Sequence, residues 1–454
     1  MKRLTCLMLA VLLPTLATPA ERGNGDVRVM TRNLYVGADI FRVVGITDPI
    51  AILMEIAAVY DTVVQTDFPS RAEALADEIA STNPHLVGLQ EVSLIRTQTP
   101  GDTLFGNPAP AEDVEYDFLL LLLDALIARG LDYVAVASVV NADVELPLLG
   151  GPVALDVRLT DRDVILARAD VPTINVLERN FDNFASLELS GTFIPFYRGY
   201  TAVDAVVNGR PYRFVNTHLE TGGAFGAATQ AAQAPELITE FADEHLPLIV
   251  VGDFNASPES APELAYAQLT GAGYTDTWAQ WAPLDDGFTC CHVETLDNPT
   301  PALTSRIDIV FARNSTTPAV NVLSSEVLGD EDGDQAPGGL WPSDHAGVFA
   351  SLDFPVGDFD DDGIDDLADN CTRAANLAQR DTDNDGYGNL CDADFNQDGF
   401  VDLLDLVYMR QNFMTADPDA DLDGDGIADL NDVGVLRTLF LLPPGPGPAD
   451  YAGL

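Results

Sequence analysis

Short apolar runs alternate with helix-like stretches along the first 354 residues of this 454-residue chain, and this alternation constrains the fold more than any other feature. Runs of roughly four to eight apolar residues, bounded by turn formers or polar residues, predict buried strands. Strands and helices mixed over about 330 residues predict one α/β or α+β domain of catalytic size, from residue 26 to residue 354. The expected strands are 27–33, 86–91, 164–167, 201–207, 212–218, 248–252, 307–311 and 346–352, and the expected helices are 70–80, 116–128, 228–243 and 261–269.

Polar side chains stand at the ends of six of these strands. Any one of them is more often a turn former or a hydrogen-bonded structural residue than a catalyst. A strand sandwich, however, presents side chains to a cleft at its strand ends, and six such ends in one chain are hard to explain as turns. We therefore expect one shared cleft, built from Asn33, the pair 90–91, the run 216–218, the run 252–255, Asp308 and the run 343–345.

Five segments around these residues carry a family resemblance. They are LVGLQEV (86–92), FVNTHLE (214–220), VVGDFNASP (250–258), RIDIVF (306–311) and SDHAGV (343–348). As a set they resemble the endonuclease/exonuclease/phosphatase superfamily, the fold of pancreatic-type deoxyribonuclease, abasic-site endonucleases and bacterial neutral sphingomyelinases. The resemblance covers residues 26–354 and implies an α/β (α+β) four-layer sandwich, with two mixed β-sheets flanked by helices. It also implies a phosphodiester hydrolase, acting on nucleic acid, a phospholipid head group or, third, a small soluble phosphoester.

The resemblance implies a metal site at three of the residues. Glu91 would be the principal ligand of Mg²⁺ or Mn²⁺, with Asn33 nearby and Asp344 as an additional ligand. Mg²⁺ is a hard cation that prefers oxygen ligands and keeps several waters, so one or two carboxylates suffice to hold it. Cleavage of a phosphodiester needs such charge neutralisation at the phosphoryl oxygens.

The same resemblance gives roles to a second group of residues around the phosphate. Asp253 would orient or deprotonate the attacking water, and Asn255 would hold the phosphate. His345 would bond a phosphate oxygen or transfer a proton, with Asp308 fixing the tautomer of its ring and raising its pKa. His218 would be the second acid–base group.

Two further positions rest on shorter matches. In the deoxyribonuclease pattern an acid just before the strand 164–167 partners the histidine that matches His218, which makes Asp161 the candidate. The family also places a phosphate-contacting arginine before the strand 201–207, which points to Arg198. A loop acid and a surface arginine are the plain alternatives for these two residues.

The region after residue 354 repeats one acidic pattern. Four twelve-residue windows carry an oxygen-bearing side chain at positions 1, 3, 5, 9 and 12 and glycine at position 6. This is the ligand spacing of calcium loops, in which position 7 adds its carbonyl oxygen. Position 12 is Asp rather than Glu, and the shorter side chain puts bidentate binding in question. The candidate Ca²⁺ ligands are Asp358, Asp360, Asp362, Asp366 and Asp369; Asp381, Asp383, Asp385, Asn389 and Asp392; Asp394, Asn396, Asp398, Asp402 and Asp405; and Asp421, Asp423, Asp425, Asp429 and Asp432.

These windows resemble two kinds of extracellular module. The first two windows resemble thrombospondin type 3 repeats. Cys371 follows the first of them, and Cys391 lies inside the second. The last two lie 27 residues apart, are each followed by an apolar helix, and resemble a dockerin, a small module of helices and loops. Dockerins bind cohesin modules, so a cohesin-like protein is the implied partner; a partner within the chain and a simple stalk are alternatives. We expect thrombospondin-like repeats at 358–392, a dockerin-like module at 394–442 with helices at 403–414 and 430–442, and a Pro/Gly-rich spacer at 443–454.

Residues 1–20 have the pattern of a secretory signal peptide, since Lys2 and Arg3 precede a short apolar stretch and several small residues. No other segment reaches about 18 apolar residues, so we expect a secreted mature chain without a transmembrane segment, which its attachment module could hold at a cell surface. After the signal, four cysteines remain for an oxidising compartment. Cys371 and Cys391 are expected to pair, whereas the adjacent residues 290–291 are either a strained vicinal disulfide or two thiols.

The formal net charge of −50 argues against a protein held to nucleic acid by a broad basic surface. From residue 355 onward, 23 acidic residues against 4 arginines give −19, which leaves −31 for the preceding residues. Lys2 is the only lysine, so an anion site must use a few arginines, backbone amides or a bound metal.

The sequence leaves two functional hypotheses open. The complete set of polar strand ends favours a secreted phosphodiesterase with a calcium-dependent attachment module. The alternative is a non-catalytic extracellular calcium-binding or adhesion protein on a pseudoenzyme scaffold. The apolar segments 144–149 and 192–196 could touch a membrane or belong to the core.

Overall fold

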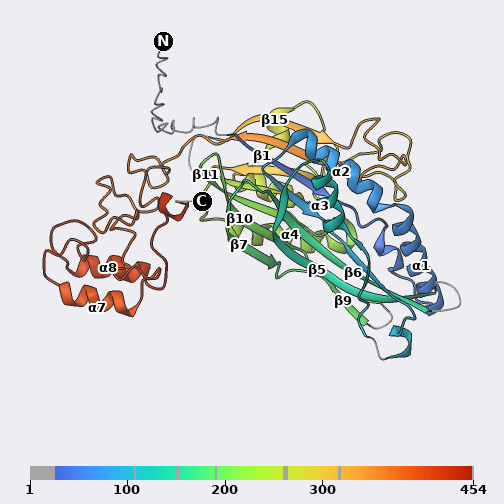
Figure 1. The fold of residues 1–454 in the computed structure, drawn as a ribbon, viewed down its shortest axis with the longest axis horizontal. Helices are drawn as coiled ribbons and strands as arrows, with labels where there is room; N and C mark the ends of the chain where they lie inside the picture. Colours follow the sequence, from blue (N-terminus) through green and yellow to red (C-terminus); the bar gives the residue numbers. More distant parts are fainter. Residues whose placement is uncertain are drawn as a thin grey trace, which may run out of the picture.

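The computed structural model describes residues 26–106, 109–149, 154–189, 192–258, 264–314 and 319–451. Figure 1 shows a large body of layered strands with helices outside them, and a smaller C-terminal body that carries two short helices. The signal peptide expected at residues 1–20 lies outside the described residues.

The first sheet contains eight strands: β1 (Asp26–Asn33), β2 (Leu86–Gln90), β3 (Leu94–Gln98), β4 (Asp113–Asp117), β5 (Tyr133–Leu149), β6 (Ala154–Arg168), β15 (Asn321–Leu328) and β16 (Gly347–Asp353). Their order is β15-β16-β1-β2-β6-β3-β4, and β5 pairs with β6 off this path. The sheet is mixed, because β1 runs antiparallel to β16 and parallel to β2.

The second sheet contains six strands: β7 (Thr173–Asn180), β10 (Gly199–Val207), β11 (Arg210–His218), β12 (Leu248–Asp253), β13 (Thr275–Asp276) and β14 (Asp308–Arg313). Their order is β13-β14-β12-β11-β10-β7. This sheet is mixed as well, since β11 and β12 are parallel and the other pairs are antiparallel. A separate ribbon pairs β8 (Ala185–Leu189) with β9 (Thr192–Phe196).

Three apolar clusters hold these layers together. One lies between the two sheets and includes Val251. A second packs Leu75 and Leu122 of two helices against the first sheet, and a third packs Leu237 and Leu269 of two others against the second. The order of layers is therefore helices, sheet, sheet, helices, as the sequence predicted. The helices of this body are α1 (Pro49–Gln65), α2 (Phe68–Thr82), α3 (Phe118–Ala128), α4 (Gly223–Glu240), α5 (Ala265–Gly271) and α6 (Thr277–Trp281).

All eight expected strands and all four expected helices of this body are present, with shifted ends, but two large elements were not expected. One is α1, whose apolar residues point both ways: Ile52 and Ile56 are buried, whereas Ile50 and Met54 are exposed. Such a helix has no polar stripe, so its sequence lacks the usual helical period. The other is the long hairpin of β5 and β6, of which the sequence indicated only residues 164–167.

Among the residues that the structure describes, no single helix is both long enough and apolar enough to cross a membrane. The pair α1 and α2 meets the criterion when taken together, across a bend of 48°.

The C-terminal body is small and has its own core. Its two helices, α7 (Leu403–Asn412) and α8 (Leu430–Leu439), are shorter than the ranges expected from the sequence. Met409 and Leu436 pack with buried alanines and valines between the loops. The expected disulfide between Cys371 and Cys391 is present, with the two Cα atoms 5.6 Å apart.

Candidate functional site

Strand register brings the polar strand ends together. Asn33 pairs with Gln90 at the end of β1 and β2 in the first sheet. In the second sheet His218, Asp253 and Asp308 lie side by side, since His218 pairs with Asp253 and Asp253 pairs with Asp308. The shared cleft predicted from the sequence is thus built from the ends of strands in both sheets.

A buried polar network joins the two sheets behind this cleft. Gln90 Nε2 donates to Asn216 Oδ1 at 2.6 Å, and Asn216 Nδ2 donates to the backbone oxygens of Leu89 and Val164. Gly88 allows this close approach, because a Cβ there would lie 2.6 Å from Asn216 Oδ1. Buried polar groups that are fully bonded in this way fix one arrangement of the layers. The sequence located Gln90 and Asn216 at the site but gave no sign of this link.

The three residues expected at the metal are near one another and mostly buried. Glu91 Oε2 accepts from Val36 N at 2.8 Å, and Asn33 Nδ2 donates to Glu91 Oε1 and Asp253 Oδ2, both at 3.1 Å. Asn33 Oδ1 is occupied by Tyr35 N at 2.8 Å. In this orientation Asn33 connects the carboxylates of Glu91 and Asp253, and its role near the metal stays a prediction.

Asp344 is the other acidic candidate at the metal end of the cleft. Burial and the neighbouring Glu91 raise the pKa of Asp344 to about 6, against the opposing effect of His345. Carboxylates placed this close to one another are favourable for a hard divalent cation, which would balance their charge. Glu91 and Asp344 therefore fit Mg²⁺ or Mn²⁺ in donor type.

His345 lies in a cluster of three carboxylates. Its Nδ1 is 2.8 Å from Asp308 Oδ2 and 3.9 Å from Asp253 Oδ2, and its Nε2 is 3.9 Å from Asp344 Oδ1. Burial alone lowers the pKa of His345, but Asp308, Asp344 and Asp253 outweigh it and raise the pKa well above the usual value. The neighbouring carboxylate also affects Asp253: burial and Asp308 raise the pKa of Asp253 to about 7.

His218 has a different environment. Arg198 Nη1 lies 3.0 Å from His218 Nδ1, and His218 Nε2 lies 3.4 Å from Asp253 Oδ2. A guanidinium can only donate, so Nδ1 accepts and the ring proton sits on Nε2. Burial, Arg198 and His345 lower the pKa of His218 well below the usual value. His218 is therefore a neutral ring on one side of Asp253, and His345 a charged ring on the other.

The structure places Asp163 near His218 Nδ1, where Asp161 was the predicted partner, although Arg198 is the group bonded to that nitrogen. The carboxylate near His218 Nδ1 is Asp163 Oδ1, at 3.9 Å. Both acids point to the same side of β6, because residues two apart in a strand share a face. Asn141 Nδ2 donates to Asp161 Oδ2 at 3.3 Å and to Asp163 Oδ2 at 2.8 Å. The two-residue period was the signal that could have pointed to Asp163.

Arg198 is buried, with 9% of its surface exposed, so it is not a surface arginine. Its Nη2 lies 3.8 Å from Glu220 Oε1, a residue that the sequence did not single out. Asn255, expected at the phosphate, lies with its Nδ2 3.2 Å from His218 Nε2 and donates to Leu219 O at 3.0 Å. Among the described residues, Asn33, Asn255 and two histidines thus surround Asp253, with Arg198 behind His218.

The backbone at the cleft is held in an uncommon conformation. Tyr35, Glu91 and Asn255 have φ values of 57°, 55° and 50°, in the left-handed region that side chains other than glycine rarely adopt. Such residues cost free energy and persist where the surrounding structure requires them, which is most common at functional sites.

A buried arginine, Arg71, supports the backbone of the cleft. Arg71 is fully buried and donates to the backbone oxygens of Thr66, Leu34, Tyr35 and Pro342. The oxygens of Leu34 and Tyr35 follow Asn33 in the chain, and that of Pro342 comes shortly before Asp344. Arg71 therefore fixes the backbone of the cleft rather than its chemistry.

The four acidic loops share one hydrogen-bond pattern. In each, the glycine at position 6 donates its N–H to the aspartate at position 1: Gly363 to Asp358, Gly386 to Asp381, Gly399 to Asp394 and Gly426 to Asp421. These glycines have φ values between 94° and 102°, which explains the residue type. Three aspartates converge within 4.8 Å of one another in the loops that begin at Asp358, Asp381 and Asp421.

Position 12 divides the loops into two kinds. Asp405 and Asp432 are buried and accept from the N-cap backbone of α7 and α8, so each closes a capping box as well as a loop. Asp369 instead accepts from Cys371 N, and Asp392 from Asp394 N, outside their own loops. Residues 290–291 lie beside His345, because Cys290 forms backbone bridges to Ser305 and His345; the choice between a vicinal disulfide and two thiols stays a prediction.

Comparison with protein families gives two matches. A model described as the Endonuclease/Exonuclease/phosphatase family matches residues 64–345. The Thrombospondin type 3 repeat matches residues 356–379 and 380–406. The second repeat match includes the loop 394–405, which the sequence suggested as the start of the dockerin-like module. A search of curated proteins returned no match.

Several solved structures are similar to this chain. One is an endonuclease/exonuclease/phosphatase from Beutenbergia cavernae, at 20% identity and a TM-score of 0.44, covering 72% of this chain and 71% of that one. A humanized D. rerio TDP2 has 15% identity and a TM-score of 0.42, with 73% and 100% covered. A mannosyl-6-phosphatase from Bacteroides thetaiotaomicron has 19% identity and a TM-score of 0.42, with 72% and 100% covered.

Proposed function

Because the chain belongs to the endonuclease/exonuclease/phosphatase family, we propose that its cleft hydrolyses phosphodiesters with the help of a divalent metal ion. One observation carries the proposal: Asp253 lies between two histidines of opposite protonation, the neutral His218 and the charged His345. Pairs of titratable groups whose environments push their pKa values apart are how a site performs acid and base chemistry at one pH.

Asp253 is the proposed base. Its pKa, raised to about 7, is near neutrality, where a carboxylate can take a proton from water and still be ionised before the reaction. The water oxygen attacks phosphorus, the bond to the leaving oxygen breaks, and the proton of the water passes to Asp253. The bond from Asn33 Nδ2 to Asp253 Oδ2 keeps the carboxylate aimed at the cleft.

His345 is the proposed acid. Asp308 holds its Nδ1, which leaves Nε2 free to donate to a phosphoryl or leaving oxygen. When the leaving oxygen departs, the proton on Nε2 passes to it, so the products are an alcohol and a phosphomonoester. The neutral His218 donates from Nε2 to a non-bridging oxygen, and Arg198 keeps that proton in place by occupying Nδ1.

The residues present fit a metal next to Asp253, since Asn33 Nδ2 donates to both Glu91 Oε1 and Asp253 Oδ2. Glu91 would hold Mg²⁺ or Mn²⁺, with Asp344 as the second carboxylate. When bound, the ion supplies positive charge that balances the phosphoryl oxygens. Asn255 and Arg198 are the proposed phosphate-binding side chains; Asp161, whose pKa burial raises to about 6, is a weaker candidate now that Asp163 lies nearer His218.

The acidic region is proposed to bind Ca²⁺ and to attach a secreted enzyme to a surface. The thrombospondin type 3 matches support Ca²⁺ binding, and the two capping boxes at Asp405 and Asp432 support paired loop–helix units of the dockerin type. We propose domain limits of 26–354, 358–392 and 394–442. The Pro/Gly-rich segment 443–454, expected as an extended spacer, is corrected: its described part packs back on residues 358–392, where Gly445 N donates to Cys391 O and Thr372 N to Pro446 O. Secretion through a signal peptide at 1–20 and a cohesin-like partner belong to the same proposal.

A metal-dependent screen tests the proposal. The intact protein would be given DNA, RNA, sphingomyelin and phosphoinositides in parallel, with Mg²⁺ or Mn²⁺ and after their removal. We expect metal-dependent hydrolysis of one class, with a loss of about 10²–10⁴-fold in Asp253→Asn. A matched control is Asp353→Asn, at a half-buried position where β16 ends, far from the cleft. No metal-dependent turnover on any diester would favour the alternative, a calcium-binding adhesion protein on a non-catalytic scaffold.

A further inference from the structure

A cavity of about 420 Å³ lies directly beside the catalytic cleft. At one end it is lined by Glu91, Asp344, Asp161 and Arg198, the charged residues of the cleft. Its remaining walls are mainly aliphatic. A volume of a few hundred Å³ with few polar groups is typical of sites that enclose small ligands.

The elements that build the cavity are the ones the sequence did not predict. α1 and η1 (Ile40–Val43) form one wall, and the β5–β6 hairpin with β9 forms the other. The wall residues Ile56, Val144, Leu146 and Ile194 also belong to an apolar cluster separate from the cores that hold the layers together. The cavity is therefore an addition to the sandwich rather than a gap between its layers.

The polar atoms around the cavity are largely engaged within the protein. Tyr35 OH donates to Glu294 O at 3.0 Å, and Asp39 accepts from Phe41 N to cap η1. Arg42 joins Glu55 of α1 to Glu294, at 2.6 and 2.9 Å, which fixes η1 over the site. The lining also holds the rings of Phe41, Tyr60 and Phe196, on which a base would stack, but it offers few free hydrogen-bonding groups to the edges of a nucleobase.

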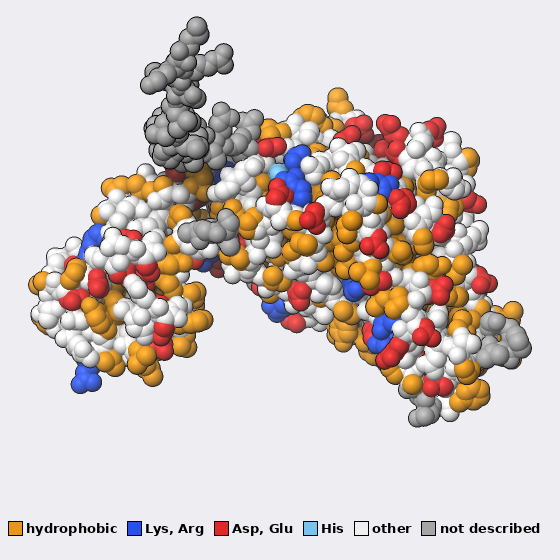
Figure 2. Space-filling view, viewed as in Figure 1, with side chains coloured by type: hydrophobic (Ala, Val, Ile, Leu, Met, Phe, Trp, Pro, Cys, Tyr) orange, Lys and Arg blue, Asp and Glu red, His pale blue; other side chains and the backbone are white. Residues whose placement is uncertain are grey.

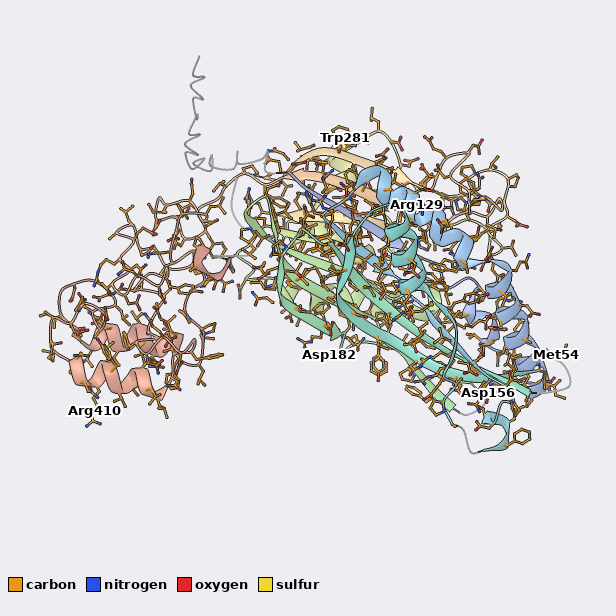
Figure 3. All side chains as sticks on the ribbon, in the orientation of Figure 1. Met54, Arg129, Asp156, Asp182, Trp281 and Arg410 are labelled. Carbon is orange, nitrogen blue, oxygen red and sulfur yellow. A yellow bond between two sulfur atoms is a disulfide. The ribbon has the colours of Figure 1, made fainter. Side chains whose placement is uncertain are left out.

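Apolar side chains are also exposed at the end of the molecule where these elements lie. Figure 2 shows hydrophobic side chains gathered there, and Figure 3 shows Met54 and Asp156 at this same end. Ile50 and Met54 of α1 are 62% and 63% exposed, and Phe193 of β9 is 63% exposed. β5 contacts both α1 and β9, so these three elements border one region of the molecule. The segments 144–149 and 192–196 thus divide between cavity wall and exposed apolar surface.

We propose that this cavity binds an acyl or alkyl chain of the substrate, so that the phosphodiester cleaved in the cleft is that of a lipid. The inference rests on the proposed function and names its substrate class. Continuity with Glu91, Asp344 and Arg198 places the phosphate beside the chain, and the exposed apolar end faces the surface that presents the lipid. The net charge of the residues before 355, −31, agrees with a neutral chain rather than a polyanion as the bound group.

Hydrolysis tests the proposal through chain length. The probes are dihexanoylphosphatidylcholine, glycerophosphocholine, which lacks the chains, and bis-p-nitrophenyl phosphate. We expect a kcat/KM for the first that exceeds that of the second by about 10-fold or more, since each methylene in an apolar pocket discriminates by about 10-fold or more. Val144→Asp should abolish this preference and leave bis-p-nitrophenyl phosphate hydrolysis within about twofold. Equal rates on the two natural diesters, or a preference retained in Val144→Asp, would overturn the proposal.

Two further variants control for folding and position. Val140→Asp alters an exposed residue of the same strand outside the cavity and should keep the preference. Val144→Phe fills the cavity with an apolar group and should lose it; thermal unfolding checks that all three variants fold.

Binding of a fluorescent fatty alcohol separates this inference from the proposed function. Saturable binding that is lost in Val144→Asp and kept in Val140→Asp supports the cavity assignment. If such binding is found but no diester is cleaved, only the proposed function is contradicted. Absence of saturable binding to the intact protein would contradict the cavity assignment.

Discussion

The large body and the acidic tail of this protein are stabilised in opposite ways. In residues 26–354 three apolar clusters hold four layers together, and charged groups such as Arg71 are buried with their partners. In residues 358–442 a single small cluster is surrounded by aspartates that accept bonds from the loop backbone. The body therefore carries its stability in its own core, whereas the tail crowds negative charge that a cation would balance. Binding and folding should be one event in the tail and separate events in the body.

Selective removal of Ca²⁺ should give the largest difference between the two regions. With EGTA and excess Mg²⁺, we expect the tail to unfold and the body to keep its transition, because each filled loop contributes about 2.7 kcal/mol at a Ca²⁺ concentration 100-fold above its Kd. Differential scanning calorimetry would record two transitions, of which one shifts. Asp421→Asn should weaken the tail, and Asp419→Asn, outside the loops, should not. One transition that EGTA leaves unchanged would contradict the comparison.

Truncation of Arg71 should affect the body alone. Arg71→Ala leaves four buried backbone oxygens without a donor, so we expect the free energy of unfolding of the body to fall by about 3 kcal/mol or more. Arg129→Ala is the control, because Arg129 pairs with Glu73 and Asp77 at the surface of the same helix, where ion pairs contribute about 0–1 kcal/mol. Equal effects of the two variants in a urea titration would show that burial of Arg71 does not matter.

Loss of the disulfide should affect the tail alone. Cys371 and Cys391 are 20 residues apart, and a loop of this size restricts the unfolded chain by about 3 kcal/mol. We expect Cys371→Ser to raise the Ca²⁺ concentration at which the tail folds, followed by circular dichroism. An unchanged calcium midpoint would mean that the bond adds nothing once Ca²⁺ is bound.

A fall in pH should lower the free energy of unfolding of the body by a smaller amount, through protonation of His85. Burial, with Arg168 and Arg28, lowers the pKa of His85 to about 4, and its Nδ1 accepts from Arg28 N at 2.9 Å. The folded state resists protonation, so His85 contributes stability above about pH 6.5 that is lost as the pH falls towards 4, at no more than about 1.4 kcal/mol per pH unit. His85→Gln should flatten the difference in unfolding free energy over that range. A parallel pH profile for the variant would exclude His85 as the cause.

The sequence predicted the parts of the site that follow strand ends. Asn33, His218, Asp253 and Asp308 each close or open an apolar run, and strand register then brings them together. Strand pairing is itself a long-range contact, which a single sequence does not display, so the link between the two sheets was not foreseen.

The sequence failed where a side chain acts from the middle of an element. Asp163 lies inside β6, and the partner of His218 depends on which face of that strand meets the second sheet. α1 has apolar residues on both faces because one packs over the cavity and the other is exposed, a pattern that periodicity cannot identify as a helix. The sequence therefore did not predict the cavity wall. It did predict the loops of the tail, because their ligand spacing is local in the chain.

The most direct test of the central claim is the rate of bis-p-nitrophenyl phosphate hydrolysis by the intact protein, measured with Mg²⁺ in the presence and absence of EGTA. The account predicts turnover that requires Mg²⁺, falls by about 10²–10⁴-fold in His345→Ala, and does not change when EGTA unfolds the tail. Turnover that survives in His345→Ala, or that disappears with the tail while Mg²⁺ is present, would contradict it.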